Sequence, residues 1–171
     1  MVIFQNIIPI LDNYRELDNL TESIDTTFNI GIRIASEEEP KFEFYTSRLG
    51  IGYKDIIPYY SQKIAEHPNA RLKMLHFFIN TGIKDTAYYW NELYKCLRVY
   101  ARLKKIAPEV DSLNIGGGFP IKTSLNFDYD YQYMVNEIVS QIKKFCEEEG
   151  VEEPNIYTEF GSFTVGESGG H

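Results

Sequence analysis

Two stretches of the sequence decide the predicted fold: FNIGIRIA at residues 28–35 and LKMLHFFI at residues 72–79. Both are nearly continuous apolar runs, and neither shows the strict polar–apolar alternation of a strand with one wet face. Such strands are buried on both faces, which is typical of a parallel sheet covered by helices. The same reasoning predicts further strands at Asn6–Leu11, Ser112–Ile115 and Asn155–Glu159, and a short one at Phe163–Val165.

Helical segments alternate with these strands. Four are predicted, at about Asn13–Leu20, Lys54–His67, Asp85–Ile106 and Tyr131–Glu149. Pro68 ends the second, Asp85 supplies the N-cap of the third, and Gly150 ends the fourth. Five strands and four helices, with no linker rich in Gly, Pro or Ser, predict an α/β fold that is one domain or a piece of one.

The composition is that of a globular protein, with 171 residues, 43% of them hydrophobic and 25% charged, and a net charge of −8. No apolar run approaches the ~18 residues of a membrane helix, and the apolar start of the chain has no basic leading segment. We therefore expect neither a membrane span nor a signal peptide. No dense Lys/Arg cluster marks a nucleic-acid binder. The acidity indicates solubility and is compatible with a cationic substrate.

The cysteines and histidines show no metal-binding spacing, so no metal is predicted. Cys96 and Cys146 are 50 positions apart and predict no disulfide framework, which favours a reducing cytoplasm. His67, His76 and His171 form no paired ligand set.

Small and polar residues gather where three predicted strands end, in HFFINTG (76–82), NIGGGFP (114–120) and TEFGS (158–162). Ligands of parallel α/β proteins bind at the carboxyl ends of the strands. Three residues without a Cβ, at 116–118, let backbone N–H groups converge on an anion such as a phosphate, although a bare turn fits the same letters. The pattern is neither GxGxxG nor GxxxxGK[ST], which argues against a dinucleotide or a nucleoside triphosphate.

Three ionisable side chains lie in these strands or at their ends. Glu159 is either a rim carboxylate in water or the partner of a cationic ring nitrogen or basic substrate. His76 fits a core histidine with satisfied hydrogen bonds better than a functional group. Arg33 lies inside a buried strand, where a guanidinium requires an anionic or aromatic partner.

Six motifs follow one another along the whole chain: PILDNYREL, IGIRIA, SRLGI, LHFFINTG, NIGGGFP and EFGSFTVGESG. In this order they resemble the fold-type III decarboxylases that use pyridoxal phosphate, a family that includes the ornithine, diaminopimelate and biosynthetic arginine decarboxylases. The last three are most similar to a bacterial arginine decarboxylase branch. The resemblance implies an internal piece of a (β/α)8 barrel, with about five parallel strands and four intervening helices.

The resemblance also implies roles for particular residues in binding pyridoxal 5′-phosphate. Glu159 matches the carboxylate that pairs with the pyridine nitrogen, and Arg33 matches an arginine close to the cofactor ring. Four glycines and one hydroxyl residue match the phosphate site: Gly116, Gly117, Gly118, Gly161 and Thr81. His76 and Phe78 complete the candidate cofactor-binding set.

The chain departs from the family pattern at several points. Phe78 stands where the family's HIGS motif has the histidine that stacks on the cofactor ring, and a phenylalanine stacks without hydrogen-bonding or carrying charge. Phe160 and Ser162 replace the Pro and Arg of the EPGR motif. No lysine here has the context of the family's Schiff-base lysine, and nothing matches its C-terminal β-domain with the catalytic cysteine. We therefore expect that the first barrel strands and the C-terminal β-domain lie outside residues 1–171, and that this piece alone is inactive.

The parent protein is expected to decarboxylate a basic amino acid, with arginine favoured, giving agmatine for polyamine synthesis in a cytoplasmic homodimer or higher oligomer. No nucleic-acid or membrane partner is expected. Two alternatives stay open: a non-catalytic relative, which Phe78 and Ser162 motivate, and a barrel enzyme of unrelated chemistry that binds a phosphate at its glycine loop. A half-barrel has two unpaired strand edges, so the isolated piece is expected to self-associate.

Overall fold

The structure, a computed structural model, describes residues 7–36, 49–121 and 127–166. Six strands of this part of the chain form one sheet: β1 (Ile10–Leu11), β2 (Phe28–Ala35), β3 (Ile51–Gly52), β4 (Ala70–Phe77), β5 (Ser112–Asn114) and β6 (Asn155–Tyr157). They lie in the order β1-β2-β4-β5-β6, and β3 pairs with the end of β2. Every pairing is parallel, as the continuous apolar runs predict.

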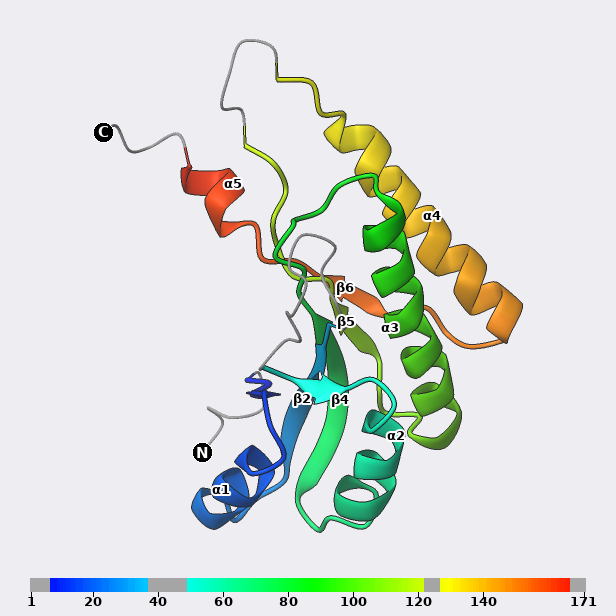
Figure 1. Ribbon diagram of the computed structural model, residues 1–171. Helices are drawn as coiled ribbons and strands as arrows, with labels where there is room; N and C mark the ends of the chain where they lie inside the picture. Colours follow the sequence, from blue (N-terminus) through cyan, green and yellow to red (C-terminus); the bar gives the residue numbers. More distant parts are fainter. Residues whose placement is uncertain (1–6, 37–48, 122–126, 167–171) are drawn as a thin grey trace.

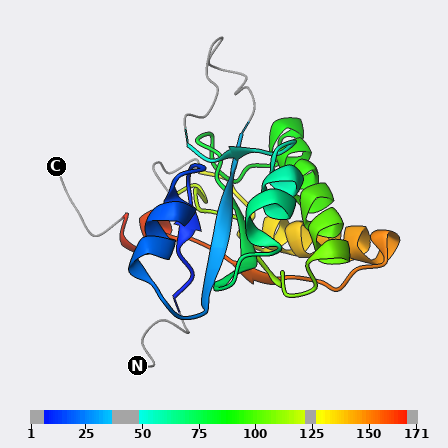
Figure 2. The ribbon, with the colours of Figure 1, turned by 90° about the horizontal axis from the view of Figure 1, so that it is seen from below.

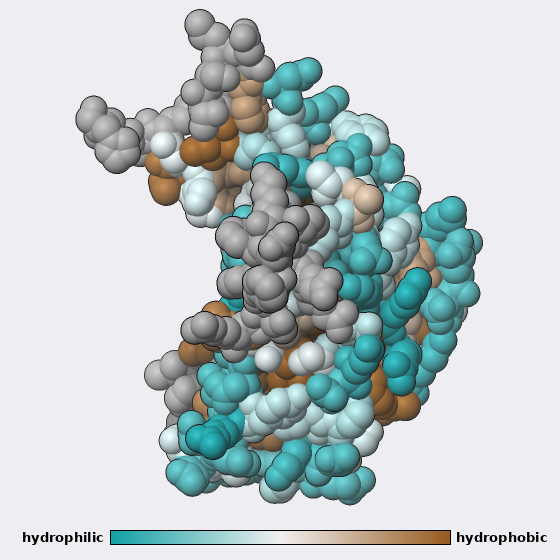
Figure 3. Space-filling view, viewed as in Figure 1, coloured by the Kyte–Doolittle hydropathy of each residue, from teal (hydrophilic) through white to brown (hydrophobic). Residues whose placement is uncertain are grey.

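The helices are α1 (Glu16–Ser23), α2 (Ile56–Tyr59) with its π-helical continuation η1 (Tyr60–Ile64), α3 (Ala87–Ile106), α4 (Tyr131–Glu149) and α5 (Gly161–Val165). Helices α2, α3 and α4 lie along one side of the sheet (Figures 1 and 2). On the side away from α3 and α4, the outline of the molecule is hollowed (Figure 3). One face of the sheet therefore carries the helical cover, and the hollow lies on the other side.

The hydrophobic core fills the space between the sheet and this helical cover. Ile30 and Ile32 of β2 and Leu75 of β4 are completely buried, in one cluster with Leu93 and Leu97 of α3. The spacing of Leu93 and Leu97 is the four-residue repeat that gives a helix one apolar face. The apolar stripe predicted for this helix is thus its contact with the sheet.

Several predicted boundaries differ from the structure: β1 is confined to Ile10–Leu11, β5 ends at Asn114, β6 ends at Tyr157, and α1 ends at Ser23. At the start of α3, a local hydrogen bond decides the difference. The N-cap of α3 is Thr86, whose hydroxyl accepts from the N–H of Tyr89 at 3.2 Å, and not Asp85, whose carboxylate accepts from the indole of Trp90. The first helix begins at Glu16, and β4 begins at Ala70. The second predicted helix is divided between α2 and η1.

The expected short strand at Phe163–Val165 is wrong, because these residues end helix α5. The N–H of Thr164 donates to the carbonyl of Phe160 at 3.0 Å, and that of Gly166 to the carbonyl of Ser162 at 2.8 Å. The helix thus satisfies locally the backbone groups that a strand would pair with a neighbour. Parts of other predictions, at residues 6, 47–48, 167–169 and 171, lie outside the described residues.

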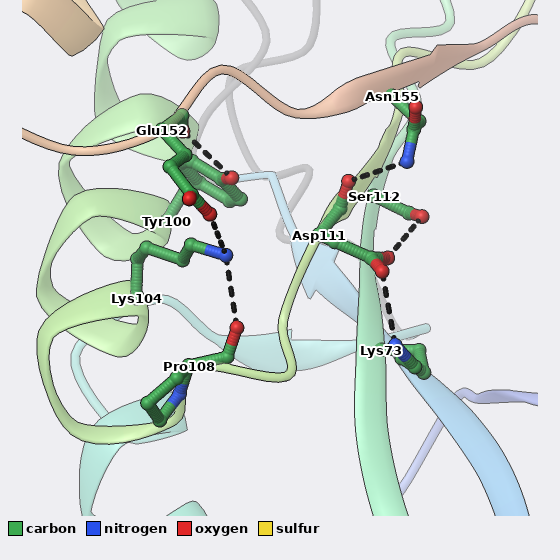
Figure 4. Close-up of polar contacts among 8 residues, drawn as sticks. All are labelled: Lys73, Tyr100, Lys104, Pro108, Asp111, Ser112, Glu152 and Asn155. Carbon is green, nitrogen blue, oxygen red and sulfur yellow. Dashed lines mark hydrogen bonds and ion pairs between the residues drawn. The ribbon is translucent and has the colours of Figure 1, made fainter.

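Polar side chains join the middle of β4 to the amino ends of β5 and β6 (Figure 4). Lys73 Nζ lies 2.9 Å from the carboxylate of Asp111, which also accepts from the hydroxyl of Ser112 at 2.7 Å. The amide of Asn155 donates to the carbonyl of Asp111 at 3.2 Å. Beside them, Lys104 contacts the carbonyl of Pro108 and the carboxylate of Glu152, each at 2.9 Å, and the hydroxyl of Tyr100 donates to the carbonyl of Glu152.

Within the described ranges, no helix is long and apolar enough to cross a membrane. The same ranges hold no group of three or more His, Cys, Asp or Glu side chains arranged to bind a metal ion. Cys96 and Cys146 are both buried and free.

Candidate functional site

A row of polar side chains crosses the sheet at one level. The register pairs Arg33 of β2 with His76 of β4, and His76 with Asn114 of β5. Side chains of directly paired residues point to the same face of a sheet. Asp12, which follows β1, and Glu159, which follows β6, extend the row at its two ends through contacts with Arg33 and Asn114.

Arg33 has the two kinds of partner that its position in a buried strand requires. Its Nη1 lies 3.5 Å from Oδ1 of Asp12, and its guanidinium carbon lies 5.8 Å from the ring centre of Phe78. A guanidinium at this distance from an aromatic ring makes a cation–π contact. The sequence-based expectation of an anionic or aromatic partner is confirmed, and Phe78 lies in the site although it is not a histidine.

Glu159 is held by the segment that follows β5. Its Oε1 accepts from the amide of Asn114 at 2.9 Å, and its backbone N–H donates to the carbonyl of Gly116 at 2.9 Å. The N–H of Gly116 in turn donates to Oδ1 of Asn114 at 2.8 Å. The side chain of Glu159 remains 51% exposed, so it is neither a free rim carboxylate nor a buried one.

His76 is buried without the hydrogen bonds expected of a core histidine. Only 8% of the residue is exposed, and within the described part of the chain neither ring nitrogen has a hydrogen-bond partner. Its Nε2 lies 3.5 Å from Oε1 of Glu159, close enough for electrostatic attraction but not aligned for a hydrogen bond. Burial, assisted by the charge of Arg33, lowers the pKa of His76, while Glu159 and Asp12 oppose that shift.

The three consecutive glycines are imposed by close packing of loops. A Cβ on Gly117 would lie 2.1 Å from the carbonyl oxygen of Glu159, and one on Gly118 would lie 2.8 Å from the Cα of Gly82. Gly116 and Gly118 also have φ angles of +68° and +98°, which other residues resist. The loops that follow β4, β5 and β6 are therefore pressed together at the carboxyl end of the sheet.

The same loop has donors to offer. The N–H groups of Gly117 and Gly118 donate to no acceptor among the described residues. Backbone N–H groups of a glycine-rich turn at a strand end are the usual means of binding a phosphate. These N–H groups favour the interpretation of the loop as an anion-binding site over its interpretation as a simple turn.

Thr81 and Gly161 lie in the loops on either side of the glycines. Thr81 is half-buried in the turn directly before Gly82, whose backbone contacts Gly118. A Cβ on Gly161 would meet no atom within 4 Å, so packing does not explain that glycine. The structure thus brings Thr81 beside the glycine loop, and it leaves Gly161 exposed at the start of α5.

Aromatic rings hold the loops of the site in place. The ring of Phe160 packs edge-on against Phe119 with 4.7 Å between centroids, and Tyr131 packs in the same way against Phe163 at 5.1 Å. The hydroxyl of Tyr131 donates to the carbonyl of Pro120 at 2.6 Å. Phe160 therefore anchors the start of α5 to the residue that follows the three glycines.

Sequence reasoning did not single out Asn114 or Asp12 as parts of the site. The available signal was their position, because each polar residue directly follows or ends an apolar strand at the level of Arg33 and His76. Their contacts depend on which loops meet in space, which the sequence alone does not give.

Comparison with known proteins places this geometry in a family. Residues 4–166 match the family model described as the pyridoxal binding domain of pyridoxal-dependent decarboxylases. The biosynthetic arginine decarboxylase of Geotalea uraniireducens is 36% identical over 101 residues, which cover 55% of this chain and 16% of that protein. The chain thus spans about a sixth of the length of that curated relative.

Solved structures of similar fold include three kinds of decarboxylase. The biosynthetic arginine decarboxylase of Campylobacter jejuni superimposes with a TM-score of 0.70 at 23% identity, covering 92% of this chain and 27% of that one. The lysine decarboxylase of Selenomonas ruminantium superimposes with a TM-score of 0.71 at 19% identity, covering 90% of this chain and 38% of that one. The diaminopimelate decarboxylase of M. jannaschii in complex with L-lysine gives 0.72 at 19%, covering 90% and 37%.

These likenesses establish the fold as part of a (β/α)8 barrel, as the sequence predicts. The family match covers nearly the whole chain, including every residue of the polar row and the glycine loop. The chain therefore belongs to the pyridoxal-dependent decarboxylases and forms their pyridoxal-binding domain in part.

Proposed function

We propose that the carboxyl end of this sheet holds pyridoxal 5′-phosphate between two groups of residues. The backbone of Gly116, Gly117 and Gly118 receives the phosphate, with Thr81 and Gly161 beside it. Glu159 receives the ring nitrogen at the other end. The observation that carries this proposal is the double link between Glu159 and the glycine loop, through Asn114 and through the backbone of Gly116.

When bound, the cofactor supplies an electron-accepting ring for the electrons released as the Cα–carboxylate bond of an amino acid breaks. The chain's part is to hold a proton at the ring nitrogen, and the carboxylate of Glu159 is suited to that task. His76 assists by staying neutral, since its burial lowers its pKa and a neutral imidazole leaves the charge of Glu159 undiminished. Phe78, fixed by its contact with Arg33, offers an apolar surface for stacking.

We further propose that the protein carrying this chain decarboxylates arginine to agmatine for polyamine synthesis, in the cytoplasm and as a homodimer or higher oligomer. The curated relatives that support this choice are named biosynthetic arginine decarboxylases. The lysine and diaminopimelate decarboxylases of similar fold support the wider class of basic amino acids. The lysine that binds the cofactor covalently, the first barrel strands and the C-terminal β-domain are proposed to lie outside residues 1–171.

The test uses the full protein that carries this chain. It is loaded with pyridoxal phosphate and supplied separately with arginine, ornithine, lysine and diaminopimelate, while carbon dioxide and the cofactor's absorbance are measured. We expect release from arginine at the highest kcat/KM. If the protein binds the cofactor but releases no carbon dioxide from any of the four amino acids, the proposed decarboxylase activity is contradicted.

One observation favours a second function, that of a non-catalytic binding relative. Phe78 and Ser162 replace a histidine and an arginine of the family's motifs, which removes two polar contacts. Cofactor binding without carbon dioxide release would support this second function. The family match argues against the third possibility, a barrel of unrelated chemistry, and the substitution Glu159→Gln tests it directly: unchanged cofactor absorbance and turnover would favour that possibility.

A further inference from the structure

A single side-chain amide connects the two halves of the proposed cofactor site. Nδ2 of Asn114 donates to Oε1 of Glu159 at 2.9 Å, and Oδ1 of Asn114 accepts from the N–H of Gly116 at 2.8 Å. A carboxamide is suited to this position because it donates and accepts at the same time. The orientation of the amide follows from its partners, since a carboxylate only accepts and an N–H only donates.

Without this contact, little would fix the side chain of Glu159. It follows β6, whose three residues are all exposed, and it is itself half-exposed. A free glutamate in such a place samples several rotamers, and ordering it costs free energy at the moment a ligand binds. Among the described residues, the carboxylate also lies near the ring of His76, at 3.5 Å and without hydrogen-bond alignment.

The contacts also determine which oxygen of Glu159 is used. Both Asn114 and His76 lie against Oε1. Oε2 is therefore the oxygen left for a further donor. A carboxylate held by one oxygen presents the other in a defined direction.

We propose that Asn114 is a positioning residue that aims Oε2 of Glu159 at the ring nitrogen of the cofactor and fixes its place relative to the phosphate loop. This inference rests on the proposed function for the identity of the ligand. The link itself exists without ligand, so one test examines the link and another examines its use.

The first test uses His76 as a reporter in the ligand-free chain. Glu159, Arg33 and Asp12 are the charged groups that act on its ring, and the charge of Glu159 raises its pKa. Replacing Asn114 by Leu releases Glu159 toward solvent, so the pKa of His76, followed by NMR, should fall. In a Glu159→Gln background the same replacement should produce no comparable fall. An equal fall in both backgrounds, or none in either, would overturn the link.

The second test measures ligand selectivity by equilibrium dialysis. The probes are pyridoxamine 5′-phosphate, which forms no adducts with lysine, and its analogue with carbon in place of the ring nitrogen. We expect the chain to prefer the natural ring by about tenfold, as a hydrogen bond to a charged group provides. Glu159→Gln should reduce this preference to about twofold or less. Asn114→Leu should reduce it as much, although Glu159 is still present in that variant.

Controls separate failure of the inference from failure of the proposed function. Asn136→Leu replaces an exposed asparagine of α4 and should retain the preference. Asn114→Ala serves if the Leu variant does not fold, as judged by circular dichroism. If the unsubstituted chain binds neither probe, the proposed function is contradicted. The His76 titration then still decides whether Asn114 holds Glu159. A preference that survives in Asn114→Leu and Asn114→Ala overturns the positioning role.

Discussion

The two ends of the sheet are built from the same strands but satisfy their polar groups differently. At the amino end, Asp111 contacts both Lys73 and Ser112, and Lys104 has two oxygen partners (Figure 4). At the carboxyl end, the ring of His76 has no hydrogen-bond partner among the described residues, and Glu159 is half-exposed.

This difference separates stability from function. At the amino end, each of these charged side chains has a partner of opposite charge among the described residues. Polar groups that are gathered but incompletely paired lower stability, and they are the groups that a ligand can complete. Barrel enzymes likewise place chemistry at the carboxyl ends of their strands and stabilising contacts at the amino ends.

The largest effect is expected from Gly117→Ala, which attacks the packing of the carboxyl end. The new Cβ would lie 2.1 Å from a backbone oxygen of the neighbouring loop, which has to move away. We expect the free energy of unfolding to fall by about 3 kcal/mol or more. Urea denaturation measures this change. Gly161→Ala is the matched control, because its Cβ meets open space and should change stability by less than about 0.5 kcal/mol.

Acidification should weaken the chain through the carboxyl end first. Burial lowers the pKa of His76 below the ordinary 6.5, so the folded state binds a proton less readily than the unfolded state. Its contribution is complete above pH 6.5 and is lost as the pH falls from there toward the folded pKa, with a slope of at most about 1.4 kcal/mol per pH unit. Denaturation between pH 7.5 and 5 measures the slope. His76→Asn should flatten it, and a slope unchanged in that variant would rule out His76 as its source.

The amino end should respond to acid at a lower pH. Burial opposes ionisation of Asp111, but Lys73 and Ser112 outweigh it and lower its pKa below 3.8. Stability from this carboxylate is therefore present above pH 3.8 and is lost as the pH falls through the folded pKa. Asp111→Ala should cost about 1 kcal/mol at pH 7, since the pair is partly exposed, and should leave the slope between pH 7.5 and 5 intact.

The smallest effect on stability is expected from Glu159→Gln. The carboxylate is half-exposed, and glutamine can still accept the hydrogen bond from Asn114. The free energy of unfolding at pH 7.5, measured by urea denaturation, should therefore change by less than about 0.5 kcal/mol. Ligand selectivity should nevertheless be lost in this variant. A large loss of stability would show that the two ends do not divide their tasks.

The sequence predicts the parts of this fold that depend on hydrophobic pattern. Strand β2 and helix α4 have the predicted bounds, and the strand ends that carry Glu159 and the glycines do meet. Strand β3 was missed because two residues carry no periodicity and pair only through β2. Helix α5 was missed because the β-branched pair Thr164 and Val165 favours a strand when its partners are unknown.

Within the site, the same limit separates single residues from their contacts. That Arg33 requires a partner follows from a charge in an apolar run. The sequence does not show that these partners are Asp12 and Phe78, or that Asn114 binds Glu159. Those contacts depend on which loops meet in the folded chain. That the ring of His76 has no hydrogen-bond partner among the described residues was missed for the same reason, since an apolar strand does not indicate which polar atoms reach its side chains.

The order of strands along the sheet has a consequence for synthesis. Apart from β3, position in the sheet follows position in the chain, and β2, β4, β5 and β6 each pair with a strand made before them. A chain that leaves the ribosome amino end first can therefore complete each pairing as the new strand emerges, without waiting for a distant segment. Folding of this sheet can therefore keep pace with translation, as β4, β5 and β6 are added in turn to the edge that began at β2.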